Sequence, residues 1–193
     1  MRNAGDGAVI AITGGVGALG RAVGDAALAS GARVVLIGRG TAPVDCPAGA
    51  LLMGGVDVAN AKAARDAFAQ VRDSFGRIDA LLNIAGGFVW ETLEAGELET
   101  WSRMFAVNLE TTVTASRAAL PHLIESGGAI VNVGASSALK AGAGMGPYAA
   151  SKAGVMKFTE ALAEEMKGRV RVNAVLPSII DTPANRADMP KSD

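Results

Sequence analysis

The sequence predicts an α/β domain built on a doubly wound parallel sheet. Short apolar segments alternate along the chain with longer segments of helical periodicity, and a glycine-rich turn joins the first strand to the first helix. The length of 193 residues fits a single domain. Strands separated by helices require right-handed crossovers, which place helices on both faces of a parallel sheet.

Six apolar segments, rich in valine, isoleucine and leucine, have the length of buried strands. They cover residues 8–12, 33–38, 51–53, 80–83, 129–133 and 170–176. Four segments between them repeat apolar residues every three or four positions, as one face of a helix does. These predicted helices cover residues 18–29, 60–75, 98–126 and 148–166.

Several residues mark the expected helix ends. Gly31 follows the first helix and suits the left-handed position that often ends a helix. Asn60 can cap the second helix, and Gly76 ends it. Pro121 lies inside the third helical segment, where we expect it to kink or break the helix.

Composition excludes several classes of protein. Eighteen basic and nineteen acidic residues give a net charge of −1, so no basic excess is available for nucleic acid. A single cysteine cannot form an intrachain disulfide, and a single histidine excludes a histidine-rich metal site. No run approaches the roughly 18 apolar residues that span a membrane. We therefore expect a cytoplasmic protein without a metal centre or a membrane segment.

The turn after the first predicted strand contains four glycines within seven residues. At a strand-to-helix junction, glycines allow a tight turn and a close backbone approach, and the following helix N-terminus attracts a pyrophosphate. A purely structural turn is the alternative. We interpret this junction as the dinucleotide site of a Rossmann fold, formed by Gly14, Gly15, Gly17, Ala18, Leu19 and Gly20.

The end of the second predicted strand bears on the choice between NAD and NADP. Sites for NAD usually carry a carboxylate there, which accepts the ribose 2′-hydroxyl. Residues 37–40 contain no carboxylate but do contain Arg39. Because a guanidinium matches phosphate geometry, Arg39 favours NADP over NAD, with a solvated surface arginine as the alternative.

Tyr148 and Lys152 lie four residues apart at the start of the last predicted helix. This spacing puts both side chains on one helix face, so the ammonium can lie beneath the phenol ring and lower its pKa. Such a tyrosine can exchange a proton with a carbonyl or alcohol oxygen. Hydride transfer to or from a nicotinamide requires this partner.

Together, the glycine turn and the Tyr148–Lys152 pair resemble the short-chain dehydrogenase/reductase family over residues 8–186. The resemblance implies that Asp57 and Val58 contact the adenine and that Asn108 organises the proton relay. It also implies that two further segments, 83–86 and 177–182, line the cofactor. Their assigned residues are Asn83, Ala85 and Gly86, then Pro177, Ile180 and Thr182, with Ile84 and Ser178 departing from the family pattern.

One departure concerns the serine that the family places thirteen residues before the tyrosine. That position is Ala135, which has no hydroxyl, and Ser136 and Ser137 follow it. One residue of bulge would present Ser136 to a substrate oxygen. Without it, Tyr148 polarises the substrate alone, as the resemblance to the dihydropteridine reductase subgroup implies. A quinonoid pterin reductase and a non-catalytic NAD(P)-binding regulator therefore remain alternatives.

Further expectations follow from the family. Members continue past this region with a lid and a last strand, so the chain, a single domain over residues 1–193, is expected to end within the lid region. The resemblance also implies a homodimer or homotetramer that acts on a small carbonyl or alcohol substrate. Small residues on the two long helices would permit close approach between protomers: Ala115, Ala118, Ala119, Ala149 and Ala153. Phe88, Trp90 and Met145 line the substrate mouth or belong to the core.

Overall fold

The computed structural model describes residues 7–40, 46–182 and 185–186. Its described strands form one parallel sheet in the order β3-β2-β1-β4-β5-β6, which confirms the doubly wound prediction. The strands are β1 (Val9–Thr13), β2 (Arg33–Ile37), β3 (Leu51–Met53), β4 (Ala80–Asn83), β5 (Ala129–Val133) and β6 (Arg171–Val175). Most residues of the expected lid, 183–184 and 187–193, lie outside the described residues.

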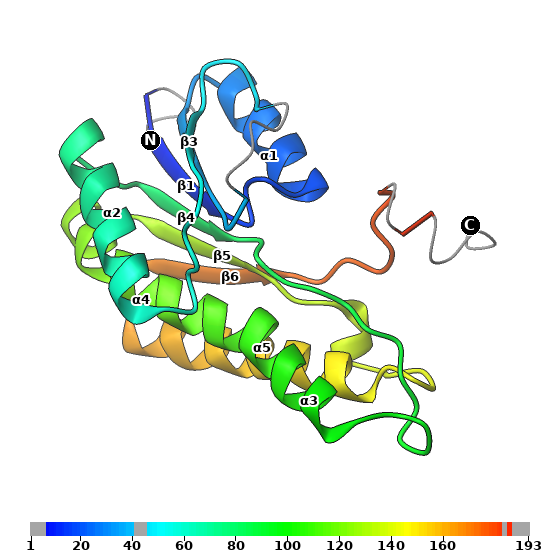
Figure 1. The fold of residues 1–193 in the computed structure, drawn as a ribbon. Coiled ribbons are helices and arrows are strands. Elements are labelled where there is room, and N and C mark those ends of the chain that lie inside the picture. Colours follow the sequence, from blue (N-terminus) through cyan, green and yellow to red (C-terminus); the bar gives the residue numbers. More distant parts are fainter. Residues whose placement is uncertain (1–6, 41–45, 183–184, 187–193) are drawn as a thin grey trace.

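The helices form two layers around this sheet (Figure 1). One layer contains α1, which packs mainly on β1 and β2, and the other contains α2, α4 and α5. The helices are α1 (Ala18–Ala29), α2 (Ala61–Phe75), α3 (Leu98–Met104), α4 (Thr111–Ser126) and α5 (Gly146–Glu165). Among the described residues, α1 covers only β1 and β2 on its face of the sheet. Helices therefore lie on both faces, as expected, but they cover one face only in part.

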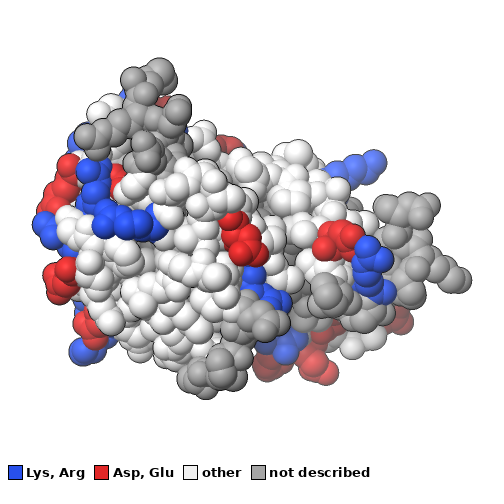
Figure 2. Space-filling view, turned by 90° about the horizontal axis from the view of Figure 1, so that it is seen from above, with Lys and Arg blue, Asp and Glu red and all other residues white. Residues whose placement is uncertain are grey.

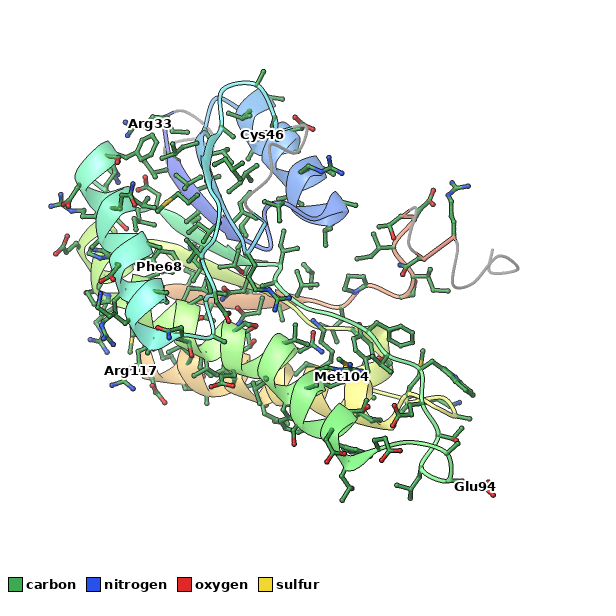
Figure 3. All side chains as sticks on the ribbon, in the orientation of Figure 1. Arg33, Cys46, Phe68, Glu94, Met104 and Arg117 are labelled. Atoms are coloured by element: carbon green, nitrogen blue, oxygen red, sulfur yellow. The ribbon has the colours of Figure 1, made fainter. Side chains whose placement is uncertain are left out.

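The second strand shows how the apolar pattern produces these layers. Successive side chains of a strand point to opposite faces. Accordingly, Val34 and Leu36 pack beneath α1, while Val35 and Ile37 belong to the larger core on the opposite face. Phe68 of α2 is fully buried in that larger core (Figure 3). The four consecutive apolar side chains of β2, at residues 34–37, therefore fill both layers.

Local signals end the helices as the sequence predicts. The Asn60 side chain accepts hydrogen bonds from the backbone N–H groups of Lys62 and Ala63, both at 3.0 Å, and so caps α2. Gly76 ends α2 in the left-handed region at a φ of 78°. Gly31 likewise has a φ of 87° just after α1.

The segment 98–126 differs from the single helix that the sequence predicts. Between α3 and α4, residues Phe105–Glu110 form a π-helical turn. Pro121 does not break α4, which continues through it to Ser126. The expected dimer contacts are also wrong in part, because Ala115, Ala119 and Ala149 are buried within the protomer itself. Their small size serves packing inside the chain.

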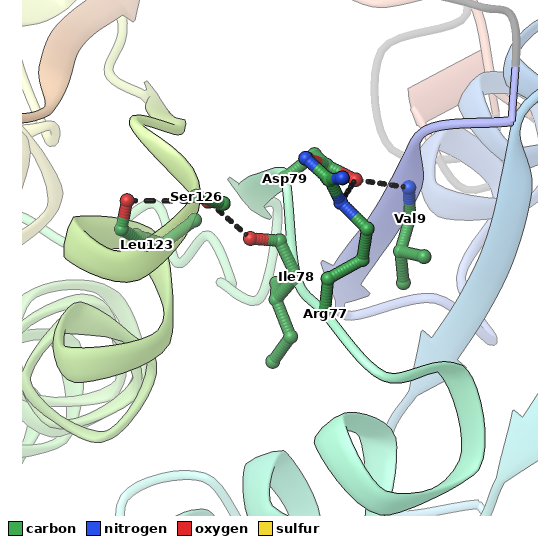
Figure 4. A network of polar contacts seen from close by, with 6 residues as sticks. All are labelled: Val9, Arg77, Ile78, Asp79, Leu123 and Ser126. Atoms are coloured by element: carbon green, nitrogen blue, oxygen red, sulfur yellow. Dashed lines mark hydrogen bonds and ion pairs between the residues drawn. The ribbon is translucent and has the colours of Figure 1, made fainter.

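A polar cluster holds the amino ends of the strands together, far from their carboxyl ends (Figure 4). The Asp79 carboxylate accepts a hydrogen bond from the backbone N–H of Val9 at 2.8 Å and pairs with the Arg77 guanidinium. The Ser126 hydroxyl donates to the carbonyl of Ile78 at 2.7 Å. These contacts connect β1, β4 and the end of α4. They stabilise the edge of the sheet at the amino ends of the strands, opposite the edge at their carboxyl ends.

The described surface carries charges of both signs. Figure 2 shows acidic and basic side chains in small mixed groups on the visible face, with uncharged surface between them. Among the described helices, none combines the length and the apolar character that crossing a membrane requires. The described residues also contain no group of three or more potential metal ligands.

Candidate active site

A cleft of about 1010 Å³ lies at the carboxyl ends of the strands. Its walls include the segments that follow each of the six strands, together with the start of α5. Parallel strands gather their following loops at one edge of a sheet, and ligands of such folds bind there. The cleft is therefore placed by the topology of the sheet.

The glycine turn forms one end of the cleft. Gly14 has a φ of 67°, which is the left-handed region. A β-carbon at Gly20 would overlap the Gly14 carbonyl oxygen and lie 2.7 Å from the α-carbon of Gly15. At Gly15, a β-carbon would lie 2.7 Å from the α-carbon of Leu36. Glycine at these positions allows the first turn of α1 to pack directly on β1 and β2.

The start of α1 fits the pyrophosphate of a dinucleotide. Gly17 precedes the helix without any side-chain cap, and the first turn contains no acidic residue. The N–H groups there consequently face the cleft with their partial positive charge uncompensated by a carboxylate. Most residues assigned to the cofactor line this cleft: Gly14, Gly17, Ala18, Leu19, Gly20, Arg39, Asp57, Val58, Ala85, Gly86, Tyr148, Lys152, Pro177, Ile180 and Thr182.

Two assigned residues lie outside the wall of the cleft. Gly15 is placed against β2, as described above. Asn83 is 2% exposed and braces the sheet instead. Its amide donates to Ser116 at 3.0 Å and to Asn132 at 2.9 Å, and its oxygen accepts from the Thr13 hydroxyl at 3.3 Å. This buried network ties β1, β4, β5 and α4 together just beneath the cleft.

Tyr148 and Lys152 lie on one face of α5 and line the cleft together. The Lys152 Nζ atom is 6.0 Å from the centroid of the Tyr148 ring. The Lys152 ammonium also donates a hydrogen bond to the Val133 carbonyl oxygen at 2.8 Å, so the end of β5 holds it. Phe88 packs edge-on against the Tyr148 ring, with the ring centroids 5.0 Å apart.

Burial controls the pKa values of this pair. It lowers the pKa of Lys152 from 10.5 to about 8, because an ammonium in the interior loses its hydration. Burial also raises the pKa of the Tyr148 phenol above its ordinary value. The expected lowering by Lys152 is therefore not found in the structure, since the loss of hydration outweighs an ammonium 6.0 Å from the ring.

Asn108 lies on the π-helical turn and is fully buried. Its side chain makes a two-point contact with the backbone of Gly87, with both hydrogen bonds at 3.0 Å, and donates to the Ser151 hydroxyl at 3.0 Å. Ser151 in turn donates to the Tyr148 carbonyl at 2.7 Å. Asn108 therefore positions α5 and the turn after β4, while its role in a proton relay stays a prediction.

The turn after β5 carries the position at which the family has its serine. Ala135 is 3% exposed and has no hydroxyl to offer. Ser136 begins a short 3-10 turn, lines the cleft, and donates its backbone N–H to the Pro177 carbonyl at 2.9 Å. The Ser137 hydroxyl is buried and has no partner among the described residues. Both serines of this turn thus line the same cleft as Tyr148, and the oxyanion role of Ser136 stays a prediction.

Several residues of the cleft wall belong to no sequence motif that would predict them there. Arg103, Val107 and Thr111 reach the cleft from α3, the π-helical turn and α4, and Lys140 and Ile179 come from loops. The π-helical turn decides which faces of that long helical segment meet the cleft. Local propensities do not predict such a turn, although its appearance at functional sites is a general observation.

The sheet order, the glycine turn and the position of the cleft define an α/β protein of the Rossmann type. Comparison with known proteins makes the class more specific. The family model for short chain dehydrogenases matches residues 8–193. The solved structure of Thermoplasma acidophilum aldohexose dehydrogenase in ligand-free form is similar with a TM-score of 0.88 at 27% identity, covering 97% of this chain and 74% of that one.

Two curated relatives agree. Meso-2,3-butanediol dehydrogenase of Serratia marcescens is 34% identical over 183 residues, which are 92% of this chain and 73% of that protein. 2-(S)-hydroxypropyl-CoM dehydrogenase 3 of Xanthobacter autotrophicus is 35% identical over 181 residues, which are 89% of this chain and 71% of that protein. The chain belongs to the short-chain dehydrogenase family of oxidoreductases, and this membership implies a nicotinamide cofactor.

The lowered pKa of Lys152 predicts a pH-dependent contribution to stability. The unfolded chain holds this proton up to about pH 10.5 and the folded chain only to about pH 8, so folding gains stability as pH rises between these values. Lys152→Met removes this gain. We expect the stability of the variant relative to the parent to fall by about 1–2 kcal/mol between pH 7 and pH 9.5.

Urea unfolding of both proteins at the two pH values measures this difference. Lys157→Met is the matched control, because Lys157 lies on the same helix but is 77% exposed and paired with Glu160. The interpretation of Lys152 is wrong if its variant shows the same pH dependence as the control.

Proposed function

We propose that this protein is an NAD(P)-dependent oxidoreductase that transfers hydride between a nicotinamide and a carbonyl or alcohol substrate. The observation that carries the proposal is the Tyr148–Lys152 pair, which faces the same cleft as the glycine turn and the start of α1. The names of the two relatives support it, since butanediol and a hydroxypropyl group both carry an alcohol.

A bound nicotinamide supplies or accepts the hydride, and the protein handles the proton. Tyr148 donates its phenolic proton to the oxygen of a carbonyl substrate, or accepts one from an alcohol. Lys152 stabilises the phenolate that this transfer leaves, because its ammonium lies over the ring. Asn108 holds Gly87 and α5 in place around the pair and contributes by position.

A ketone without activation needs a second hydrogen-bond donor at its oxygen, and we assign this role to Ser136. Its place in the cleft wall after β5 supports the assignment. Ala135 at the position of the family serine favours a second candidate, reduction of an already activated acceptor such as a quinonoid pterin. Such an acceptor loses less from the missing donor.

We also propose that the chain prefers NADP, because Arg39 lines the cleft just after β2 and no carboxylate lies at residues 37–40.

The proposed assembly is a homodimer or homotetramer of a single domain. Its contacts would use the outer face of α4, where Arg117 is exposed (Figure 3), and the outer face of α5, since Ala115, Ala119 and Ala149 are buried within the protomer.

Replacing Tyr148 by Phe tests the reaction. Because the phenol is the proton donor, we expect turnover to fall by about 10²–10⁴-fold while the affinity for the dinucleotide stays the same. Turnover is followed as NADPH and NADH oxidation over a panel of ketones, aldehydes and a quinonoid pterin. Unchanged turnover in the variant would contradict the assignment, and a parent that binds dinucleotide but reduces nothing on the panel would indicate a regulator.

Replacing Arg39 by Ala tests the nucleotide preference. Loss of a guanidinium–phosphate contact is expected to weaken NADPH binding about tenfold or more and to leave NADH binding unchanged. Fluorescence titration with both dinucleotides measures the ratio. Arg21→Ala is the control, since Arg21 lies on α1 and does not line the cleft. An unchanged ratio for Arg39→Ala would remove Arg39 from the site.

Replacing Ser136 by Ala tests the oxyanion donor. For a ketone substrate we expect kcat to fall by about 10²–10³-fold, as loss of one such donor does elsewhere. Ser137→Ala in the same turn is the matched variant. A normal rate for Ser136→Ala with any ketone would exclude Ser136, and a selective loss in Ser137→Ala would assign the role to Ser137 instead.

A further inference from the structure

The loop between β4 and α3 is joined to the loop that precedes α5 by an acidic residue that no step of the reaction uses. Glu91 lies on the first loop, three residues after Phe88. Its backbone N–H donates to the Gly144 carbonyl at 2.8 Å. Gly144 is two residues before α5 begins, so the contact joins the two loops next to the start of α5.

The carboxylate of Glu91 makes two more contacts, both with residues at the start of α3. It accepts hydrogen bonds from the backbone N–H of Glu97, which precedes α3, and from the Thr100 hydroxyl at 2.8 Å. Thr100 is 5% exposed, so its hydroxyl is out of contact with bulk water. A β-carbon at Gly96 would overlap the Glu91 carboxylate, which explains the glycine there. Glu91 therefore connects three segments.

Both tryptophans of the chain pack on the loop that Glu91 holds. Gly144 has a φ of 74°, and a β-carbon there would overlap the Trp90 indole. At Gly146, a β-carbon would lie 3.3 Å from the Trp101 ring. The two glycines thus allow two aromatic rings to lie directly on the backbone that leads into α5.

This loop leads directly into the helical turn that carries the phenol of Tyr148. Met145 precedes α5, and its carbonyl accepts the first helical hydrogen bond, from Ala149 at 2.7 Å. Tyr148 lies within that first turn and contacts Phe88 edge-on. Phe88 and Met145 both line the cleft. The loop therefore leads through Met145 into the turn that carries the phenol, and the part of the cleft wall formed by Phe88 and Met145 is named here the substrate mouth.

We propose that Glu91 is a positioning residue that sets the width of the substrate mouth and thereby selects substrates by the bulk of the group beside the carbonyl. Its carboxylate fixes the Phe88 side to α3, and its backbone fixes the Met145 side at Gly144. The inference rests on the proposed function, and it assigns substrate discrimination to a residue outside the cleft wall.

Glu91→Ala tests this proposal with a pair of substrates, a methyl ketone and the corresponding phenyl ketone. Loosening the mouth is expected to change the ratio of their kcat/KM values about tenfold, mainly through KM, with the dinucleotide affinity unchanged. Glu91→Gln, which keeps an acceptor oxygen, is expected to restore most of the ratio. Gly96→Ala, which displaces the carboxylate, is expected to act like Glu91→Ala.

Glu94→Ala is the matched control, because Glu94 lies exposed on the same loop (Figure 3) and makes no hydrogen bond among the described residues. The chain has only two indole N–H signals, from Trp90 and Trp101. Nuclear magnetic resonance of these signals provides a readout independent of activity. We expect both to shift in Glu91→Ala and neither in Glu94→Ala.

The outcomes separate the two proposals. Indole shifts together with a changed ratio support the role of Glu91. Indole shifts with an unchanged ratio would overturn it, and so would unchanged indole signals. If the parent reduces neither ketone, the proposed function fails on this pair, and the indole signals still decide whether Glu91 holds the loop.

Discussion

The site depends on keeping one ammonium charged inside the protein. Lys152 is 5% exposed, and an interior ammonium without partners would lose its proton or destabilise the fold. The Val133 carbonyl at the end of β5 satisfies one of its protons. The pKa stays at about 8, so the charge persists at neutral pH. The charge is retained beside Tyr148 at a cost in stability, as functional sites commonly show.

The surrounding strands and helices hold Lys152 and its hydrogen-bond partner in place. Lys152 of α5 reaches the carbonyl of Val133, the last residue of β5, and the parallel order of β4, β5 and β6 brings the carboxyl ends of these strands to one edge. The Asn83–Asn132 contact at 2.9 Å holds the neighbouring strands β4 and β5 in register beneath the cleft, and the Asn132 amide donates in turn to the Thr159 hydroxyl of α5 at 2.8 Å. Asn108 fixes the same helix from the other side. Buried amides that are fully hydrogen-bonded give rigid sheets and helices of this kind.

Much of this fold is readable from the sequence because its signals are local. Asn60 caps a helix through its own side chain, and Gly14 needs a left-handed conformation wherever the chain turns so tightly. The spacing of Tyr148 and Lys152 is likewise a property of one helix. The site residues that were found this way lie at strand ends or on single helical turns.

What could not be predicted depends on contacts between distant segments. The π-helical turn at Phe105–Glu110 carries the buried Asn108, which contacts Gly87 and Ser151 from distant parts of the chain, and no local pattern in its own residues predicts it. The inward orientation of Ala115 and Ala119 follows from how α4 meets the sheet. The raised pKa of Tyr148 is a consequence of burial, whereas spacing alone favours the opposite shift. Glu91 and Gly144 are joined across more than fifty residues of chain.

The proposed reaction requires the Lys152 ammonium to favour the Tyr148 phenolate when a nicotinamide is bound, although burial raises the pKa of this phenol in the free protein. Tyr148 is the only tyrosine in the sequence, so the absorbance of tyrosinate reports this group alone. Titrating the free protein and its complex with oxidised dinucleotide tests this requirement directly. We predict a pKa above the ordinary value of a tyrosine in the free protein, because the phenol is buried, and a lower pKa in the complex. An unchanged pKa in the complex would contradict the account.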